Sequence, residues 1–234
     1  MLVTERPDLA LGLLTRIESN YGEYIKGEKL VHIKELTLCL RKAWYDRHGY
    51  GTEGTEGEDT FLLSLPHQAR TKIALGTAFG KLANEVEDEV SILFDDIKVV
   101  GHVDLTTVEN EHDVPHEIKV TWSHRTNISP QYVEQLAAYC VAYGEVYGRL
   151  MIVKVNEKGG PVVHCFEYEF TETEMVEWRP ELGRRVWVIV GDELPSFTDH
   201  WKWECNDCLY NMNKVPDAPC EARDGKAGGG WFVG

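Results

Sequence analysis

The sequence predicts a mixed α/β fold built around two β-hairpins. Two pairs of β-branched, alternating segments, each pair joined by a short polar or glycine-containing turn, are typical of antiparallel hairpins. Apolar residues at the 3-to-4 spacing of helices precede, separate and follow these hairpins. With 234 residues, 43% of them hydrophobic, the chain can bury one sizeable core. These features exclude a disordered or fibrous protein.

The N-terminal part is predicted to be mainly helical. Within residues 31–48, apolar positions have the spacing of an amphipathic helix, and this helix carries Cys39. Residues 51–59 contain three glycines, four carboxylates and no apolar side chain, which predicts a mobile loop. A second helical pattern runs from about residue 67 to 92, and its second half is strongly acidic.

The first predicted hairpin pairs residues 98–109 with residues 114–122, and residues 110–113 form its polar turn. Pro130 then opens a helix that we expect to run to about Tyr147, because proline is well suited to the first turn of a helix.

The second predicted hairpin pairs residues 149–157 with residues 161–170. Thr171 and Glu174 form a capping box for a last long helix, in which Pro180 predicts a kink or break. A cysteine-bearing, loop-rich segment follows. The tail after it contains five glycines within residues 224–234 and is expected to be poorly ordered.

The charge of the chain limits how it can contact nucleic acid. Its 39 acidic and 24 basic residues give a formal net charge of −15, which excludes a protein that simply coats nucleic acid or an anionic membrane. Any DNA contact must therefore be local and assisted by a metal. The best candidate for a phosphate-facing surface is a locally basic stretch that contains Lys26, Lys29, Lys34, Arg41, Lys42 and Arg47.

Hydropathy predicts a protein that does not enter a membrane, because no apolar run approaches the roughly 20 residues that a membrane span requires. Glu5, Arg6, Pro7 and Asp8 stand where a signal peptide needs apolar residues, so export is not expected. The cytoplasm is the expected location.

Two carboxylates and a lysine are predicted to converge at the first hairpin. Glu117 and Lys119 are two residues apart in one strand and share a face, and Asp104 lies in the other strand. Carboxylate oxygens select Mg²⁺ or Mn²⁺, and a lysine can orient an attacking water. The arrangement predicts phosphodiester hydrolysis. An ordinary solvated ion pair on an exposed strand is the alternative.

Four short motifs occur in the order and on the element types of the RecB-like nucleases of the PD-(D/E)XK superfamily, which this sequence resembles. They are Gly80-Lys-Leu-Ala-Asn84, Gly101-His-Val-Asp104, Glu117-Ile-Lys119 and Gln135-Leu-Ala-Ala-Tyr139. The resemblance implies a restriction-endonuclease-like fold, in which helices flank a mixed sheet.

The resemblance also assigns roles to these residues. Metal ligands would be Asp104, Glu117, Asn84 and the Ile118 carbonyl, while Lys119 would position the water. The catalytic set would be completed by Gln135 and Tyr139, which would support the site and contact the DNA strand. The alternative for these last two is a buried tyrosine beside a capping glutamine. We interpret His102 and His116 as structural.

Asn84 departs from the family pattern, in which a histidine ligand stands at this position. An amide oxygen binds Mg²⁺ or Mn²⁺ more weakly, so metal affinity or preference would differ. Glu85 or Asp88 could compensate for the change.

The six cysteines divide into two groups. Cys205 and Cys208 form a C-x₂-C pair, Cys220 follows, and Cys39 lies in a phrase that resembles the upstream cluster ligand of CRISPR-associated RecB-like exonucleases. The resemblance implies a 4Fe-4S cluster that clamps the N- and C-terminal segments together. Four thiolates suit Zn²⁺ as well, which is the alternative. The remaining cysteines, Cys140 and Cys165, are predicted core residues.

The predicted organisation has four parts: an N-terminal segment with the first cluster ligand (1–60), a nuclease core (61–200), a C-terminal cysteine segment (201–223) and a flexible tail (224–234). The chain is most similar to the CRISPR-associated exonucleases, the fourth protein family of CRISPR systems. This resemblance implies trimming of chiefly single-stranded DNA ends, with the CRISPR adaptation integrase as a partner. Alternatives are a phage or repair nuclease of the same fold and a non-catalytic nucleic-acid-binding adaptor.

Overall fold

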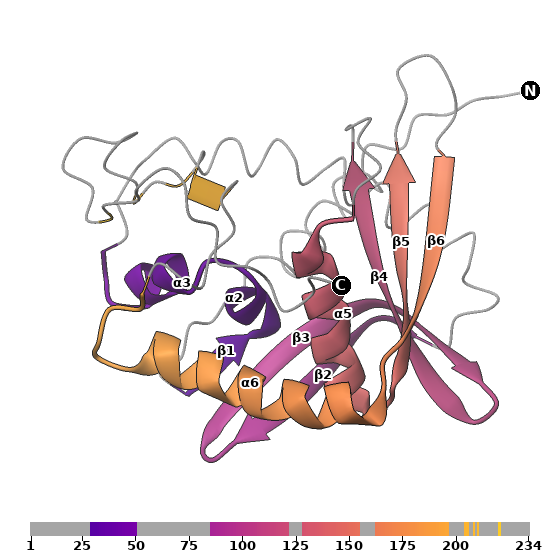
Figure 1. Ribbon diagram of the computed structural model, residues 1–234, viewed down its shortest axis with the longest axis horizontal. Helices are drawn as coiled ribbons and strands as arrows, with labels where there is room; N and C mark the ends of the chain where they lie inside the picture. The colour runs from indigo at the N-terminus through magenta and orange to yellow at the C-terminus, as the bar shows by residue number, and fades with distance from the viewer. Residues whose placement is uncertain are drawn as a thin grey trace, which may run out of the picture.

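The structure is a computed structural model that describes residues 29–50, 85–121, 128–154 and 162–196, together with residues 204, 205, 208, 210 and 220. The described residues form one mixed six-stranded sheet, which confirms the predicted mixed α/β core (Figure 1). Its strands are β1 (Leu30–His32), β2 (Glu85–Phe94), β3 (Ile97–Glu109), β4 (His112–Thr121), β5 (Tyr147–Lys154) and β6 (Val162–Glu169).

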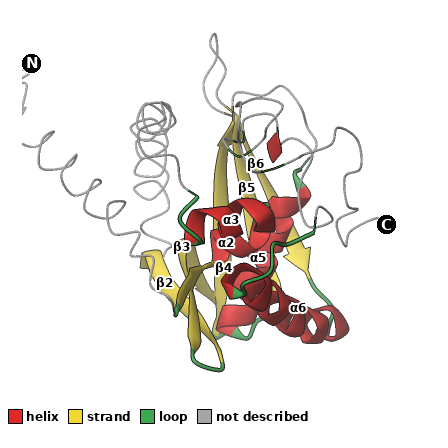
Figure 2. Ribbon diagram, turned by 90° about the vertical axis from the view of Figure 1, so that its left-hand side faces the viewer, coloured by secondary structure: helices red, strands yellow, loops and turns green. Residues whose placement is uncertain are grey.

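The described helices lie on one side of this sheet, as Figure 2 shows. They are α2 (Ile33–Thr37), α3 (Leu40–Arg47), α5 (Pro130–Tyr143) and α6 (Glu172–Val190). Helix α5 packs on β4, β5 and β2, and α6 packs on α5 and α3. Among these described helices, none is both long and apolar enough to cross a membrane.

The predicted helix over residues 31–48 is wrong in two places. Its first residues form β1, which pairs in parallel with β3, and the rest is divided into α2 and α3. Leu38 is extended and Cys39 is the N-cap of α3, so Cys39 does not lie inside a helix. The break is stabilised from outside, because the Cys39 N–H donates to Glu204 Oε1 at 3.0 Å.

The acidic second half of the predicted helix over residues 67–92 is also wrong, because residues 85–94 form strand β2. Val90 and Ile92 are buried, while Glu89, Ser91 and Leu93 are exposed, which is the period of two expected for a strand. Pairing with β3 supplies backbone hydrogen bonds along one edge of β2. The first half of the predicted helix, the predicted loop at 51–59 and the tail at 224–234 lie outside the described residues.

Both predicted hairpins are confirmed. The first has a two-residue turn at Asn110 and Glu111, whose φ angles of 51° and 71° place both in the left-handed region. The turn is thus shorter than the four polar residues predicted for it. The turn residues predicted for the second hairpin lie outside the described residues.

The two later helices begin where the sequence predicts. Pro130 opens α5, and Gly144 ends it earlier than expected with a φ of 74°, a conformation that glycine adopts without strain. Thr171 and Glu174 form the predicted capping box of α6. Helix α6 continues through Pro180, so the chain does not break there, and a kink at this residue stays a prediction.

The sheet contains a gap that positions the candidate site. Strand β2 covers one edge of β3, whereas β1 and β4 share the other edge. β1 pairs with residues 98–100 of β3 and β4 with residues 105–109, so neither strand pairs with residues 101–104. β4 then turns away from β3 and pairs in parallel with β5 from His116 to Thr121 (Figure 1).

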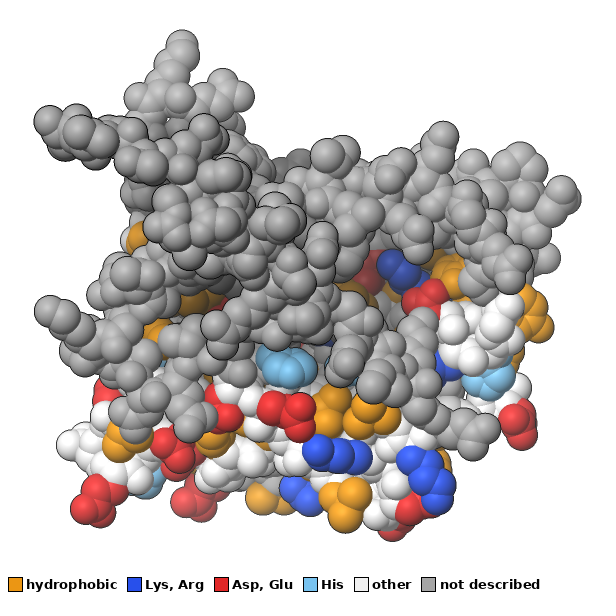
Figure 3. Space-filling model, turned by 180° about the vertical axis from the view of Figure 1, so that it is seen from behind, with side chains coloured by type: hydrophobic (Ala, Val, Ile, Leu, Met, Phe, Trp, Pro, Cys, Tyr) orange, Lys and Arg blue, Asp and Glu red, His pale blue; other side chains and the backbone are white. Residues whose placement is uncertain are grey.

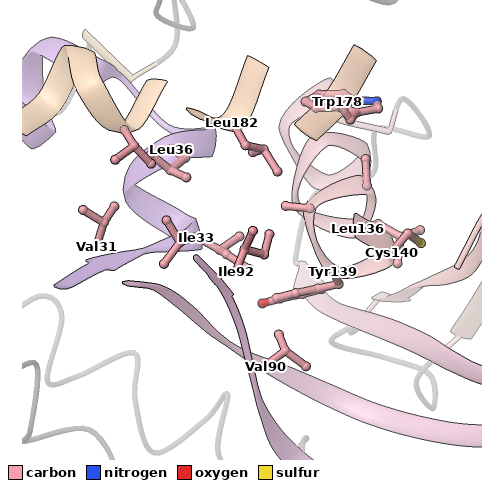
Figure 4. Packing of buried hydrophobic residues seen from close by; sticks show 14 of the residues in the cluster. Val31, Ile33, Leu36, Val90, Ile92, Leu136, Tyr139, Cys140, Trp178 and Leu182 are labelled. Carbon is pink, nitrogen blue, oxygen red and sulfur yellow. The ribbon is translucent and has the colours of Figure 1, made fainter. Parts of the chain in front are cut away.

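The hydrophobic core fills the space between the sheet and the helices. Side chains from β1, α2, β2, α5 and α6 meet there (Figure 4). Leu36, Leu136, Cys140 and Leu182 have no exposed surface. The prediction of a core position is confirmed for Cys140, but it is wrong for Cys165, which is exposed on the edge strand β6.

Candidate active site

Asp104 lies at the gap between β1 and β4. Its carboxylate Oδ2 accepts a hydrogen bond from the Ile118 backbone N–H at 2.8 Å, in the place of a backbone ladder bond. The pairing of Leu105 with His116, continued by one residue, puts Asp104 opposite Glu117. Both carboxylates are buried, with exposed fractions of 7% and 2%. The structure therefore brings the two predicted acidic residues together.

Lys119 joins these carboxylates from the same strand. Its ammonium forms an ion pair with Glu117, and it donates a hydrogen bond to Gln135 Oε1 on α5 at 2.9 Å. The side chain is 21% exposed, so the ammonium is largely shielded from water. Burial strengthens the attraction between these charges, because the effective dielectric constant is lower than in water.

A chain of hydrogen bonds continues from Lys119 into the helix and back to the sheet. Gln135 Nε2 donates to the Tyr139 hydroxyl at 2.8 Å, and that hydroxyl donates to the His102 carbonyl at 2.9 Å. His102 lies in the part of β3 that has no strand partner on this edge, so Tyr139 satisfies a carbonyl at the gap. One network thus joins the predicted residues of β4 and α5 to β3.

The surroundings of Gly101 show why the G-x-x-D motif has a glycine at this position. A Cβ at this position would lie 2.8 Å from Tyr139 Cε1 and 2.7 Å from Ile33 Cδ1. Only a residue without a side chain permits this close approach of α5 to β3. The motif glycine therefore sets the position of Tyr139.

A buried ion pair joins helix α5 to helix α6. Arg185 of α6 donates to Glu134 Oε2 at 2.6 Å and to the Leu36 carbonyl at 2.9 Å, and it also pairs with Glu181. Glu134 and Gln135 are neighbours in α5, so Arg185 ties the helix that carries Gln135 to α6 and α2.

Tyr132, on the first turn of α5, contacts this site but was not predicted, and Gln131 precedes it on the same turn. The Lys119 ammonium lies 5.2 Å from the ring centroid of Tyr132, within cation–π range. Gln131 is 9% exposed, and its Oε1 has no hydrogen-bond partner among the described residues. The sequence contains a signal for Gln131, because residues 131, 135 and 139 are spaced four apart and share one helix face.

Asn84 stands at the position of the family histidine, and Glu85 and Asp88 are its possible substitutes. The structure describes the side chain of Asp88 alone among these three residues. Asn84 lies outside the described residues, and the side chain of Glu85 is not described. Asp88 accepts a hydrogen bond from the Tyr143 hydroxyl, which is also 2.9 Å from Thr106 Oγ1. Burial and this contact with Asp88 raise the pKa of Tyr143 well above its usual value.

The oxygen atoms at the gap between β1 and β4 are of the type that binds a hard divalent cation. Among the described residues, no group of three or more histidine, cysteine, aspartate or glutamate side chains is arranged to hold a metal ion. The candidate ligands are therefore two buried carboxylates, Asp104 and Glu117, with the backbone carbonyl of Ile118 between the acidic residue and the lysine of the motif. Oxygen ligands of this kind suit Mg²⁺ and Mn²⁺.

The two nearby histidines differ in environment. His116 is buried and lies 2.9 Å from Thr107 Oγ1, and burial lowers its pKa to about 4, which agrees with a structural role. The His102 ring is exposed and lies 3.9 Å from Glu89, while its backbone carbonyl takes part in the site.

The predicted phosphate-facing surface is wrong for its two arginines. Arg41 is buried and donates to the Pro195 carbonyl at 2.9 Å, and Arg47 pairs with Glu35 at 2.7 Å. These guanidinium groups join elements of the fold and do not form a basic surface. On the face shown in Figure 3, acidic and basic side chains are interspersed, and its described surface carries no continuous basic area.

The segments that carry the four predicted cluster cysteines pack against one another. Cys205, Cys208 and Cys220 pack in a hydrophobic cluster with Trp44, Tyr45 and Tyr210. The hydrogen bond from the Cys39 N–H to Glu204 brings Cys39 to the same segment. Burial raises the pKa of the Cys39 thiol to about 12, and the nearby Cys208 and Cys205 act in the same direction. Cys39 and Cys220 are buried, and Cys205 and Cys208 are half-buried. Thiols are the soft ligands that iron–sulfur clusters and Zn²⁺ take, but no three of these side chains are arranged in the structure as a metal site.

Comparisons with known proteins support the fold. No family model and no curated protein matches the chain. The crystal structure of a protein designated SSO0001 has a TM-score of 0.61 at 16% identity, covering 90% of this chain and 97% of the other. This likeness shows that the two chains share a fold.

Two further crystal structures are more distant. A phage-related exonuclease from Haemophilus somnus 129PT has a TM-score of 0.42 at 10% identity, covering 68% of this chain and 92% of the other. A candidate exonuclease from Eubacterium rectale has a TM-score of 0.43 at 13% identity, covering 82% of this chain and 88% of the other.

Proposed function

We propose that the protein is a DNA nuclease that uses Mg²⁺ or Mn²⁺ to hydrolyse phosphodiester bonds. The observation that carries this proposal is the meeting of Asp104, Glu117 and Lys119 at a gap in the sheet, with Gln135 and Tyr139 bonded to the lysine side of the site. An ordinary solvated ion pair is a poorer account, because both carboxylates are buried.

The residues of the chain divide the work as follows. Asp104, Glu117, the Ile118 carbonyl and Asn84 would hold the cation, which would neutralise charge on the scissile phosphate and make water a better nucleophile. Lys119 orients the attacking water through its ammonium group. Gln135 fixes the position of that ammonium by accepting one of its hydrogen bonds.

Tyr139 in turn fixes the Gln135 amide, because its hydroxyl accepts from Nε2 and donates to the sheet. Such a chain of bonds holds a reacting group in one geometry and so lowers the entropic part of the barrier.

The substrate we propose is chiefly single-stranded DNA at its ends. The resemblance to CRISPR-associated exonucleases supports trimming of DNA ends for spacer acquisition together with the adaptation integrase. Phage or repair recombination is the alternative setting for the same reaction. Size-exclusion chromatography with the integrase tests the setting, and a complex that elutes as one species is the expected result.

We further propose a 4Fe-4S cluster on Cys39, Cys205, Cys208 and Cys220. Its first role is structural, because it joins residues that are far apart in the sequence and so reduces the entropy of the unfolded chain. The packing of Cys205, Cys208 and Cys220 beside aromatic rings supports this assignment, as does the link from Cys39 to the same segment through Glu204. Zn²⁺ remains the competing occupant.

Cleavage of labelled single-stranded DNA by anaerobically purified protein tests the nuclease function. We expect cleavage with Mn²⁺ or Mg²⁺ and a fall of about 10²-fold or more for Lys119→Ala, because removing one preorganised hydrogen-bond donor from an active site costs about that much. Lys98→Ala is the matched control, since Lys98 is exposed and pairs with Glu89 on the same sheet. Absence of wild-type cleavage with both metals would refute the proposal.

Absorption and metal content test the cluster. We expect a broad band near roughly 400 nm for the wild-type protein, as thiolate-bound iron–sulfur clusters show. Cys39→Ser should lose the band and the iron, whereas Cys140→Ser should keep both, because Cys140 is buried in the separate core between the sheet and helices. A colourless protein that contains zinc would establish the alternative.

A further inference from the structure

Lys119 is paired with one of the two carboxylates that are candidates to hold the cation. Its ammonium forms an ion pair with Glu117, whose side chain is buried. A divalent cation on Glu117 would lie close to this ammonium, because both positive groups bind the same carboxylate. Two positive charges at such close range repel each other strongly in a partly shielded site. The ammonium and the cation therefore compete for Glu117.

The ammonium has two other contacts, and both come from helix α5. It donates a hydrogen bond to Gln135 Oε1 at 2.9 Å, and it lies 5.2 Å from the ring centroid of Tyr132. An amide and a phenol ring carry no net charge, so neither adds a negative charge for which the two cations would compete. Loss of the contact with Glu117 would leave the ammonium bound to α5 through these two residues.

Both contacts from α5 are fixed by parts of the structure outside the ion pair. The Gln135 amide donates to the Tyr139 hydroxyl, which in turn donates to the His102 carbonyl. Tyr132 packs against the hydrophobic core between the sheet and the helices. The positions of these two residues thus do not depend on the contact between the ammonium and Glu117. They form a second binding position for the ammonium.

We propose that the Lys119 ammonium and the divalent cation exchange at Glu117. Gln135 and Tyr132 retain the ammonium when the cation takes the carboxylate. An ammonium has three N–H donors, so release from Glu117 frees one of them for the attacking water. Lys119 thus orients water only when the cation is bound. The inference rests on the proposed nuclease function and gives Gln135 and Tyr132 a positioning role in cation binding.

Binding of Mn²⁺ to the full-length protein tests the exchange without DNA or turnover. Electron paramagnetic resonance of free Mn²⁺ measures the Kd. Lys119→Met removes the competing ammonium and keeps a long side chain, so we expect Kd to fall about tenfold or more, as for removal of a like charge beside a binding group. Lys98→Met is the matched control and should keep the wild-type Kd, because Lys98 is exposed and pairs with Glu89 on the same sheet.

Neutral substitutions separate the exchange from simple charge repulsion. Gln135→Met removes an acceptor of the ammonium without changing the charge of the site, so repulsion alone predicts an unchanged Kd. The exchange predicts a Kd about three- to tenfold higher, because the amide is the remaining acceptor once the cation takes Glu117. In the Lys119→Met protein the same substitution should have no effect, because no ammonium is left to retain. Tyr132→Leu gives the same test through its cation–π contact if Gln135→Met does not fold.

Each outcome decides the proposal. It is overturned if Lys119→Met binds Mn²⁺ no more tightly than the wild type, or if the wild type does not bind Mn²⁺. It is also overturned if the neutral substitutions leave Kd unchanged, or if they weaken binding equally with and without Lys119. If the wild type cleaves DNA and one of these results is found, the exchange is wrong and the nuclease function stands. If the expected binding pattern is found and the wild type cleaves no DNA, the exchange stands and the nuclease function fails.

Discussion

Replacing Arg185 by methionine should destabilise the protein strongly. The guanidinium donates to Glu134 at 2.6 Å, to Glu181 at 2.7 Å and to the Leu36 carbonyl at 2.9 Å, and its side chain is 9% exposed. Burial disfavours its charge, but the two carboxylates keep the pKa of Arg185 above its usual value. Removing it leaves Glu134 as a buried charge without this partner, which costs about 3 to 5 kcal/mol.

Arg184→Met is the matched control for this experiment. Arg184 is the neighbouring residue, its side chain is 45% exposed, and it pairs with Glu181 at 2.8 Å. Exposed ion pairs contribute about 0 to 1 kcal/mol, because water and salt screen them. Urea unfolding followed by circular dichroism gives both free energies of unfolding.

A second variant tests the reason for the loss. Replacing Glu134 by leucine in the Arg185→Met protein removes the buried charge, so much of the lost stability should return. The reasoning is refuted if Arg185→Met costs no more than Arg184→Met, or if the double variant is as unstable as Arg185→Met alone.

Three further outcomes are expected. Gly101→Ala should lower the free energy of unfolding by about 1 to 3 kcal/mol and slow DNA cleavage, because the new methyl group would displace Tyr139; wild-type values in both assays would contradict this. Tyr132→Leu should slow cleavage about 2- to 30-fold through loss of its cation–π contact with Lys119, while Tyr132→Phe should keep near-normal rates. Burial opposes ionisation of Glu181, but hydrogen bonds from two arginines lower its pKa below 4.5 overall. Its contribution to stability is thus present above that pH and lost as the pH falls through the lowered pKa, so Glu181→Gln should show a shallower loss of stability on acidification in urea titrations.

The sequence predicted the elements whose signals are local. Alternation of apolar and polar residues identified both hairpins, and Thr171 with Glu174 located the start of α6. The same alternation placed Glu117 and Lys119 on one strand face, where they form an ion pair. These signals depend only on neighbouring residues, so they can be read before any tertiary contact is known.

Predictions went wrong where a distant segment decides the local structure. Residues 85–94 contain apolar residues that fit a helical spacing, but pairing with β3 makes them a strand. Arg41 and Arg47 look like surface cations in the sequence, yet Arg41 bonds to the Pro195 carbonyl far along the chain and Arg47 bonds to Glu35 on the preceding helix α2. Phe166 and Tyr168 of β6 pack on the core, so Cys165, which alternates with them along the strand, points to the opposite face and is exposed.

The sequence by itself determined the order of the motifs and the chemistry that their side chains can supply. Only the tertiary structure decided that Asp104 meets Ile118 at a gap between β1 and β4, and that Gln131 is buried with its Oε1 lacking a hydrogen-bond partner among the described residues. The physical reason is that side-chain type and spacing are local properties. Burial, charge pairing and unsatisfied hydrogen bonds depend on which distant segments pack together.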